Sequence, residues 1–66
     1  MTVKINDTEV SLPQGSTISQ ALDAAGIKPA GIAVALNGTV VPKADYSNRT
    51  LADGDTILII KAFYGG

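Results

Sequence analysis

The sequence of 66 residues contains no cysteine, no histidine and no tryptophan. Without cysteine, neither a disulfide nor a cysteine-based metal site can stabilise the fold. Without histidine, the chain lacks the side chain most often used as a general base, as a zinc ligand or as the activator of a nucleophile. An enzyme of this composition would depend on scattered carboxylates, lysines and hydroxyls. The composition therefore argues against a catalytic role.

Charge of one sign and long apolar runs are also scarce. Five basic and six acidic residues give a net charge of −1, and the basic residues stand singly along the chain. This spread argues against nucleic acid or an anionic membrane as the main partner. No apolar stretch approaches the roughly 18 residues of a membrane span, and the first residues enter a strand pattern rather than a signal peptide. We therefore expect a cytoplasmic protein.

The length predicts one domain over residues 1–66, near the lower limit at which a single hydrophobic core stabilises a chain. A core of this size leaves no room for a deep substrate pocket. The first twelve residues alternate between apolar and polar side chains, which predicts two short strands joined by a turn at Asn6-Asp7. This turn places Lys4 opposite Glu9 on the outward side. The predicted inward positions are Val3, Ile5, Thr8, Val10 and Leu12.

A short helix is predicted to follow Thr17. Thr17 and Gln20 have the spacing of a capping box, in which each side chain accepts a hydrogen bond from the backbone of the other residue. Gly26 suits the left-handed position after the helix, and Ile27 could then fold back onto Leu22, as in a Schellman ending. One apolar stripe should face the core. It consists of Ile18, Ala21, Leu22 and Ala25.

The second half of the chain contains two strong turn signals. Asn37-Gly38 favours a tight hairpin between strands at residues 32–36 and 39–41, and Pro42 ends the second strand, as expected of an edge strand. Residues 43–52 read as a polar connector with one helical turn.

Asp53-Gly54-Asp55 then predicts a turn that leads into the last strand. Its two carboxylates are too few for a calcium loop, so we expect no metal site.

The last strand, residues 57–60, has no polar alternation, which favours a central position in the sheet. Pairing it side by side and parallel with the first strand gives a mixed sheet with one helix across it. The expected fold class is therefore α+β, as a ubiquitin-like β-grasp with four to five strands and one main helix packed on one face. An α+β sandwich of another topology is the alternative.

The parity of these strands predicts a surface for a partner. In residues 32–36 the bulky side chains fall on one face, so Ala33 and Ala35 share the other face, which should be flat and uncovered. Ile57 and Ile59 should join the core, which leaves Leu58 and Ile60 beside the two alanines. We expect this patch to bind a partner, although single exposed apolar residues are common on protein surfaces. Phe63 and Tyr64 are candidate anchors at the same interface.

Gly65-Gly66 follows the apolar run directly. Glycine has no Cβ, so this pair could pass through a narrow channel, and we expect residues 63–66 to form a flexible tail that presents the Gly66 carboxylate. A carboxylate is a poor electrophile at neutral pH, and reaction with ATP would convert it to a reactive acyl-adenylate. The chain has no machinery for that step. An ATP-using partner enzyme must therefore supply it.

Across residues 1–66 the sequence resembles the family of small sulfur carriers of thiamine biosynthesis. The resemblance implies that Gly66 is adenylated by an enzyme similar to ubiquitin-activating enzymes and is then converted to a thiocarboxylate, with Gly65 as the flexible access residue. It also implies a persulfide sulfur donor, thiazole synthase as the recipient, and no cofactor bound to the carrier itself. The supporting segments are Asn6-Asp7, Gly15-Ser16-Thr17-Ile18, residues 33–38, Val41-Pro42, Asp53-Gly54-Asp55 and Gly65-Gly66.

One segment departs from this resemblance, and other functions stay open. The family is expected to carry small residues before its final glycines, where this chain has Phe63-Tyr64. A carrier of another sulfur pathway, such as the small subunit of molybdopterin synthase, would share the glycine pair, although that subunit is usually longer. A ubiquitin-like protein modifier would share it too. A non-carrier β-grasp binding module, in which Gly65-Gly66 is incidental, is the alternative from a different class.

Overall fold

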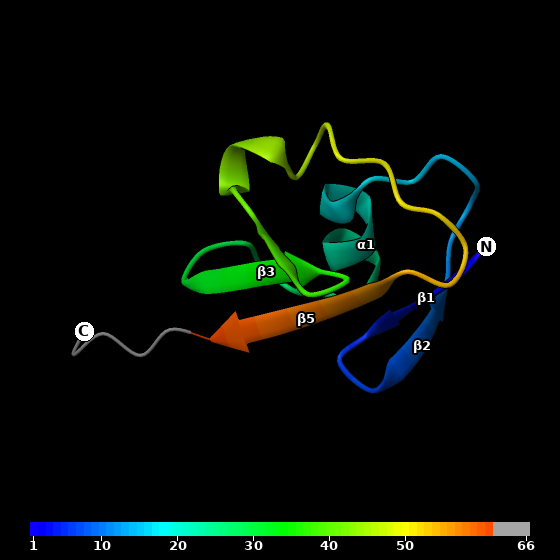
Figure 1. Ribbon diagram of the computed structural model, residues 1–66, viewed down its shortest axis with the longest axis horizontal. Helices are drawn as coiled ribbons and strands as arrows, with labels where there is room; N and C mark the ends of the chain where they lie inside the picture. The colour runs from blue at the N-terminus through cyan, green and yellow to red at the C-terminus, as the bar shows by residue number, and fades with distance from the viewer. Residues whose placement is uncertain (62–66) are drawn as a thin grey trace.

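The computed structural model describes residues 1–61, and residues 62–66 lie outside the described part of the chain. The predicted tail at residues 63–66 therefore stays a prediction. The described residues form five strands, one α-helix and one 3-10 turn (Figure 1). The elements are β1 (Thr2–Ile5), β2 (Thr8–Ser11), α1 (Ile18–Ala24), β3 (Ile32–Leu36), β4 (Thr39–Val41), η1 (Lys43–Asp45) and β5 (Thr56–Lys61).

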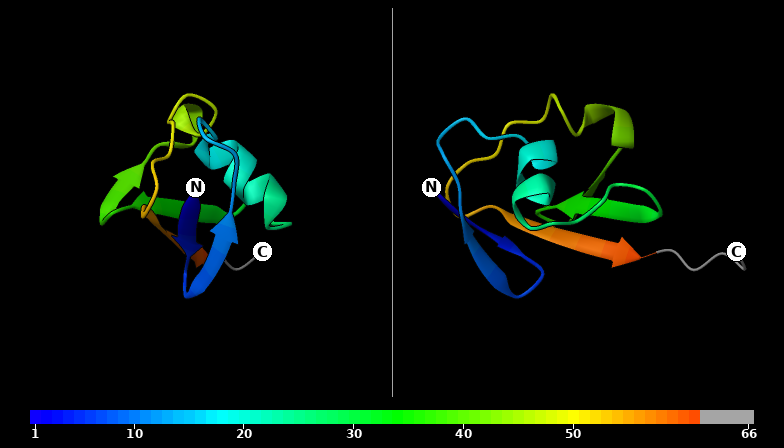
Figure 2. Two further views of the ribbon diagram at one scale, coloured as in Figure 1. Left: turned by 90° about the vertical axis from the view of Figure 1, so that its right-hand side faces the viewer. Right: turned by 180° about the vertical axis from the view of Figure 1, so that it is seen from behind.

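The strands form one mixed sheet in the order β2-β1-β5-β3-β4, with β5 at the centre. β5 runs parallel to β1 and antiparallel to β3. The helix and the 3-10 turn lie on the same side of the sheet, and the other side carries no covering element among residues 1–61 (Figure 2). This arrangement confirms the α+β β-grasp prediction, including the central position of the last strand.

Both hairpins turn where the sequence predicts. Asn37 and Gly38 have φ angles of 50° and 86°, which match the type I′ turn that joins strands without splaying them. Asn6 also has a positive φ, of 55°, a conformation that asparagine tolerates better than most residues. The register of β1 and β2 places Lys4 opposite Glu9, as expected.

The helix has seven residues, which is too short for stability by itself, so its ends and its packing must hold it. The predicted capping box is present: the Gln20 N–H donates to Thr17 Oγ1 at 3.3 Å, and the Thr17 N–H donates to Gln20 Oε1 at 2.9 Å. At the other end Gly26 has φ 72°, and the Ile27 N–H donates to the Leu22 carbonyl at 2.8 Å. This confirms the Schellman ending.

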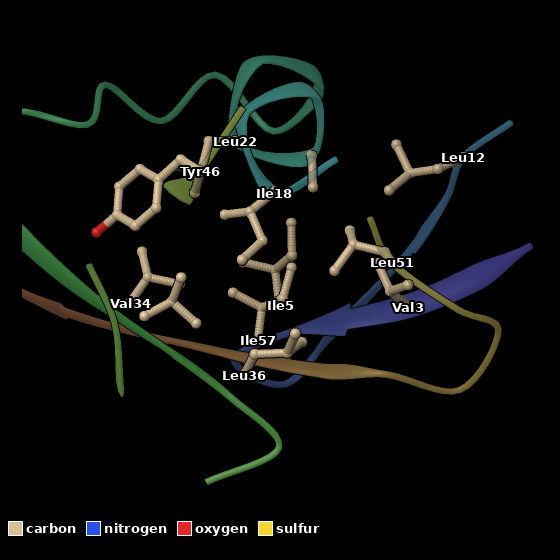
Figure 3. Close-up of a cluster of buried hydrophobic side chains, with 12 residues drawn as sticks. Val3, Ile5, Leu12, Ile18, Leu22, Val34, Leu36, Tyr46, Leu51 and Ile57 are labelled. Carbon is tan, nitrogen blue, oxygen red and sulfur yellow. The ribbon is translucent and has the colours of Figure 1, made fainter. Parts of the chain in front are cut away.

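The core lies between α1 and the sheet, with contributions from the long connector (Figure 3). Two of the predicted core-facing side chains are not buried. Thr8 lies opposite Ile5 and so faces the predicted side of the sheet, but it is exposed at the start of β2. Ala25 is exposed because it follows the last residue of α1. The buried cluster consists of Val3, Ile5, Leu12, Ile18, Ala21, Leu22, Val34, Leu36, Val41, Tyr46, Leu51 and Ile57.

The connector between β4 and β5 was predicted as polar, but it contributes two side chains to the core, because Tyr46 and Leu51 are both buried. Its backbone also pairs with the start of the helix. The Ile18 N–H donates to the Arg49 carbonyl at 3.1 Å, and the Leu51 N–H donates to the Ser16 carbonyl at 2.8 Å. The predicted helical turn in this segment is present as η1.

Candidate functional site

The side of the sheet opposite the helix carries a group of apolar side chains. The antiparallel register of β3 and β5 places Ala33 opposite Ile60 and Ala35 opposite Leu58, and the register of β3 and β4 places Ala35 opposite Val40. Residues directly opposite each other in a sheet point to the same face. We define these five residues as the open sheet face: Ala33, Ala35, Val40, Leu58 and Ile60.

Three members of the open sheet face are large aliphatic side chains that are exposed and lie close together, on the two strands that flank β3. Val40 is 66% exposed, Leu58 49% and Ile60 46%. Their neighbours on β5 point the other way, since Ile57 is fully buried and Ile59 packs against the core. The predicted parity of the last strand is therefore confirmed. One strand supplies both the centre of the core and the centre of an exposed apolar surface.

Two details of the predicted patch differ from the structure. Ala35 is only 6% exposed, so the expectation that it lies uncovered is wrong. It lies between Val40 and Leu58, whose larger side chains flank its methyl group on both sides. The sequence reasoning also missed Val40. The signal was present, because Val41 faces the core and strand alternation then turns Val40 outward.

The predicted turn before β5 is stabilised by hydrogen bonds that the aspartate side chains of the turn accept. The Asp53 carboxylate accepts a hydrogen bond from the Thr2 N–H at 2.7 Å, and the Asp55 carboxylate accepts one from the Ala52 N–H at 2.8 Å. Asp55 also accepts from the amide of Asn37 at 3.0 Å. These carboxylates anchor the start of β5 to β1 and to the β3–β4 hairpin.

The predicted tail residues Phe63, Tyr64, Gly65 and Gly66 lie outside the described residues, so their roles stay predictions. The structure does describe β5, the strand that precedes them in the chain. β5 extends to Lys61, and the side chains of Leu58 and Ile60 on that strand belong to the open sheet face. A partner bound to this face would therefore contact the strand from which the tail continues.

Within residues 1–61 there is no group of three or more side chains of the kinds that ligate a metal. In the same residues, no helix is long and apolar enough to cross a membrane.

A central strand parallel to the first one, with a single helix across one face, defines a small ubiquitin-like β-grasp protein. A ubiquitin-like protein from the archaeon Caldiarchaeum subterraneum shares this fold, with a TM-score of 0.58 and 17% identity over 98% of this chain and all of that chain. Within this class, the chain belongs to the ThiS family, whose family model matches residues 2–66.

Two members of the family show how far the similarity extends. The sulfur carrier protein ThiS of Escherichia coli K12 is 30% identical over 66 residues, and the aligned region covers the whole of both chains. The crystal structure of the thiamine biosynthesis protein ThiS from Geobacter metallireducens has a TM-score of 0.83 and 23% identity, again with full coverage of both chains. This second likeness supports the fold.

Proposed function

We propose that this protein is the sulfur carrier of thiamine biosynthesis and that the Gly66 carboxylate holds the sulfur as a thiocarboxylate. Membership of the ThiS family makes the chain a small carrier protein rather than a catalyst. The observation that carries the proposal is the match with the sulfur carrier of Escherichia coli, whose alignment covers the whole of both chains. The absence of histidine and cysteine agrees with a protein on which other enzymes act.

The chemistry begins with activation of the carboxylate. In a partner enzyme similar to ubiquitin-activating enzymes, a carboxylate oxygen of Gly66 attacks the α-phosphate of ATP, and pyrophosphate leaves. The resulting acyl-adenylate is a mixed anhydride with a good leaving group. The outer sulfur of a persulfide donor then attacks the carbonyl carbon and displaces AMP, which gives an acyl disulfide between donor and carrier. A thiol attacks the donor's sulfur, breaks the sulfur–sulfur bond and releases the thiocarboxylate, while the thiol and the donor end as a disulfide. The net result is one oxygen of Gly66 exchanged for sulfur, which thiazole synthase receives for the thiazole ring. We place this exchange in the cytoplasm, where ATP is available.

In this proposal Gly65 gives the tail access to the active site, because a residue without Cβ meets the least steric resistance in a narrow channel. Phe63 and Tyr64 are proposed to contact the walls of the channel entrance, which must be wide enough for aromatic side chains. Neither residue is expected to take part in the chemistry.

The open sheet face is the proposed docking surface for the adenylating enzyme. Val40, Leu58 and Ile60 expose apolar area to water, and covering that area is favourable. The face is small, which suits a carrier that must leave one enzyme and bind the next, because transient complexes have small interfaces. Ala33 and Ala35 keep the face flat between the larger side chains, so a partner surface can approach the sheet closely.

The proposal is tested by incubating the protein with the adenylating enzyme of the same organism, ATP, a persulfide donor and a thiol reductant, and measuring the intact mass. We expect the mass to increase by the difference between one sulfur and one oxygen atom. Omitting ATP should abolish the increase. If the mass stays constant with every adenylating enzyme of that organism, the carrier proposal fails. Use of the sulfur in the reaction of thiazole synthase, rather than in that of molybdopterin synthase, separates the thiamine pathway from the alternative.

A further inference from the structure

The central strand β5 is paired unequally on its two sides. On the β3 side the pairing covers five positions, from Leu36 opposite Ile57 to Ile32 opposite Lys61. On the β1 side it covers only two positions, with Ile5 opposite Ile57 as the last. The chain turns away at Asn6-Asp7 to form β2. Among residues 1–61, the second half of β5 therefore has a strand neighbour on one side alone.

The hydrogen bonds show which peptide groups face the unpaired side. The Asn37 N–H donates to the Thr56 carbonyl at 2.8 Å, so Thr56 faces the β3 hairpin, and the Asn6 N–H donates to the Ile57 carbonyl at 2.8 Å, so Ile57 faces β1. Adjacent residues of a strand alternate in this direction. The peptide groups of Ile59 and Lys61 must therefore also face the β1 side.

On the β1 side of β5, the last hydrogen bond is made by the side chain of Asn6 rather than by a backbone carbonyl. Its Oδ1 accepts the Ile59 N–H at 2.9 Å, in the place where a backbone carbonyl would accept it if β1 continued. The next two groups along β5 are the Ile59 carbonyl and the Lys61 N–H. No hydrogen-bond partner for either is found within residues 1–61. We define these two groups as the open strand edge.

The open strand edge has the geometry of one step of a parallel ladder. In such a step, one residue donates its N–H to the carbonyl of one strand residue and accepts from the N–H two residues further on. Lys4 begins a step of this kind opposite Thr56, the first residue of β5, where the Lys4 N–H donates to the carbonyl of the preceding residue, Asp55, at 2.9 Å. A residue opposite Ile60 would make the corresponding step with Ile59 and Lys61.

The surroundings have room for the side chains of an added strand. Two shallow hollows share Ile27 on the helix side of the sheet. One, of about 320 Å³, is lined in part by Ile5 and Asn6, and the other, of about 340 Å³, is lined in part by Lys61. On the opposite side of the sheet, the edge borders Ile60 of the open sheet face.

We propose that a partner protein adds an extended segment to the open strand edge, parallel to β5 and in line with β1. Unpaired donors and acceptors of a strand edge recognise the backbone of another strand, which is why such edges recruit extended peptides. The Ile59 N–H is already bonded to Asn6, so an antiparallel segment opposite Ile59 would lack its donor, whereas the parallel step is complete. The inference deepens the proposed function, since the partner is the enzyme that receives the tail.

The test compares two substitutions at one position. Lys61→Pro removes the N–H of the open strand edge, and proline is tolerated on the unpaired side of a strand. Lys61→Ala removes the charge and keeps the N–H. We expect Lys61→Pro to weaken binding to the adenylating enzyme about fivefold, the effect of one lost hydrogen bond, with Lys61→Ala close to the unchanged protein. Binding is measured by isothermal titration calorimetry, after circular dichroism and the unfolding midpoint show both variants folded.

Hydrogen exchange gives a second readout that needs no substitution. We expect the Lys61 amide to exchange at least about tenfold more slowly in the saturated complex, with little change at the Ile60 amide, which faces β3. Equal exchange of the Lys61 amide in free and bound protein would overturn the proposal, as would equal binding by the two Lys61 variants. Protection of this amide in a dimer of the free chain would assign the edge to a second copy instead.

These outcomes are separable from those of the proposed function. If the unchanged protein never gains sulfur, the carrier proposal fails. If it gains sulfur and the Lys61→Pro variant binds and reacts equally well, only the added strand is excluded.

Discussion

At the scale of single residues, asparagine and aspartate side chains make several of the hydrogen bonds that hold the strands and turns of this protein together. Asn37 Oδ1 accepts the Thr56 N–H at 2.9 Å, and its Nδ2 donates to the Asp55 carboxylate at 3.0 Å. Asp55 in turn accepts the Ala52 N–H at 2.8 Å. The β3–β4 hairpin and the start of β5 are therefore joined through two side chains. A chain of this length has few residues available for longer strands with more backbone hydrogen bonds between them.

We expect Asp55→Ala to lower the free energy of unfolding by about 1–2 kcal/mol, because it removes the acceptor of two hydrogen bonds, one of them from the backbone. Urea denaturation followed by circular dichroism measures the change. The matched control is Asp23→Ala, an exposed carboxylate in the last turn of α1, where negative charge opposes the helix dipole. That variant should be as stable as the unchanged protein or slightly more so. Equal losses in both variants would contradict the role given to Asp55.

At the scale of elements, β5 contributes side chains both to the hydrophobic core and to the proposed docking surface. Its odd positions, Ile57 and Ile59, pack under the helix, and its even positions, Leu58 and Ile60, lie on the open sheet face. A one-residue shift in register would exchange the two sets. The Asp53-Gly54-Asp55 turn opposes such a shift, since the Asp53 carboxylate accepts the Thr2 N–H at the start of β1 and the Asp55 carboxylate accepts from the side-chain amide of Asn37 in the β3–β4 turn.

Adjacent residues of β5 should therefore respond in opposite ways to the same substitution. Leu58→Asp should leave the free energy of unfolding within about 1 kcal/mol of the unchanged value, because the new carboxylate stays in water. It should weaken binding to the adenylating enzyme at least about tenfold, because a charge would be buried in an apolar interface. Ile57→Asp should prevent folding, since it buries an unpaired carboxylate in the core.

Calorimetric titration and thermal unfolding of both variants check this prediction. A folded Leu58→Asp variant that binds like the unchanged protein would show that the open sheet face is not the docking surface. Loss of folding in that variant would mean that Leu58 supports the core in a way its exposure does not indicate.

Strand parity was predictable from the sequence because alternation in residues 32–36 and the turn signals at Asn37-Gly38 are local patterns. The burial of Tyr46 and Leu51 was not, because the connector has no period that marks one face. Each of these side chains reaches the core singly, and the connector is placed by backbone bonds to distant residues, as between Leu51 and Ser16. The low exposure of Ala35 was not predictable from its own strand either, because it results from the larger side chains of Val40 and Leu58 on the two adjacent strands.

At the scale of the whole molecule, recognition and reaction are assigned to different parts of the chain. The buried cluster, the open sheet face and the open strand edge all belong to residues 1–61. The reacting carboxylate is proposed at Gly66. If this division is correct, a chain without Gly66 keeps every described contact of the folded body. It should therefore fold with the stability of the full chain and still bind the adenylating enzyme.

Such a shortened chain, residues 1–65, should consequently inhibit the reaction of the full chain. It occupies the docking surface of the enzyme but presents its carboxylate one residue short of the position where ATP reacts. We expect competitive inhibition of thiocarboxylate formation, measured by intact mass with increasing amounts of the shortened chain. The control adds Leu58→Asp to the shortened chain, which should relieve the inhibition, because it removes recognition by the open sheet face. Without inhibition by residues 1–65, recognition would have to lie mainly in the tail, and the body would contribute little beyond holding it.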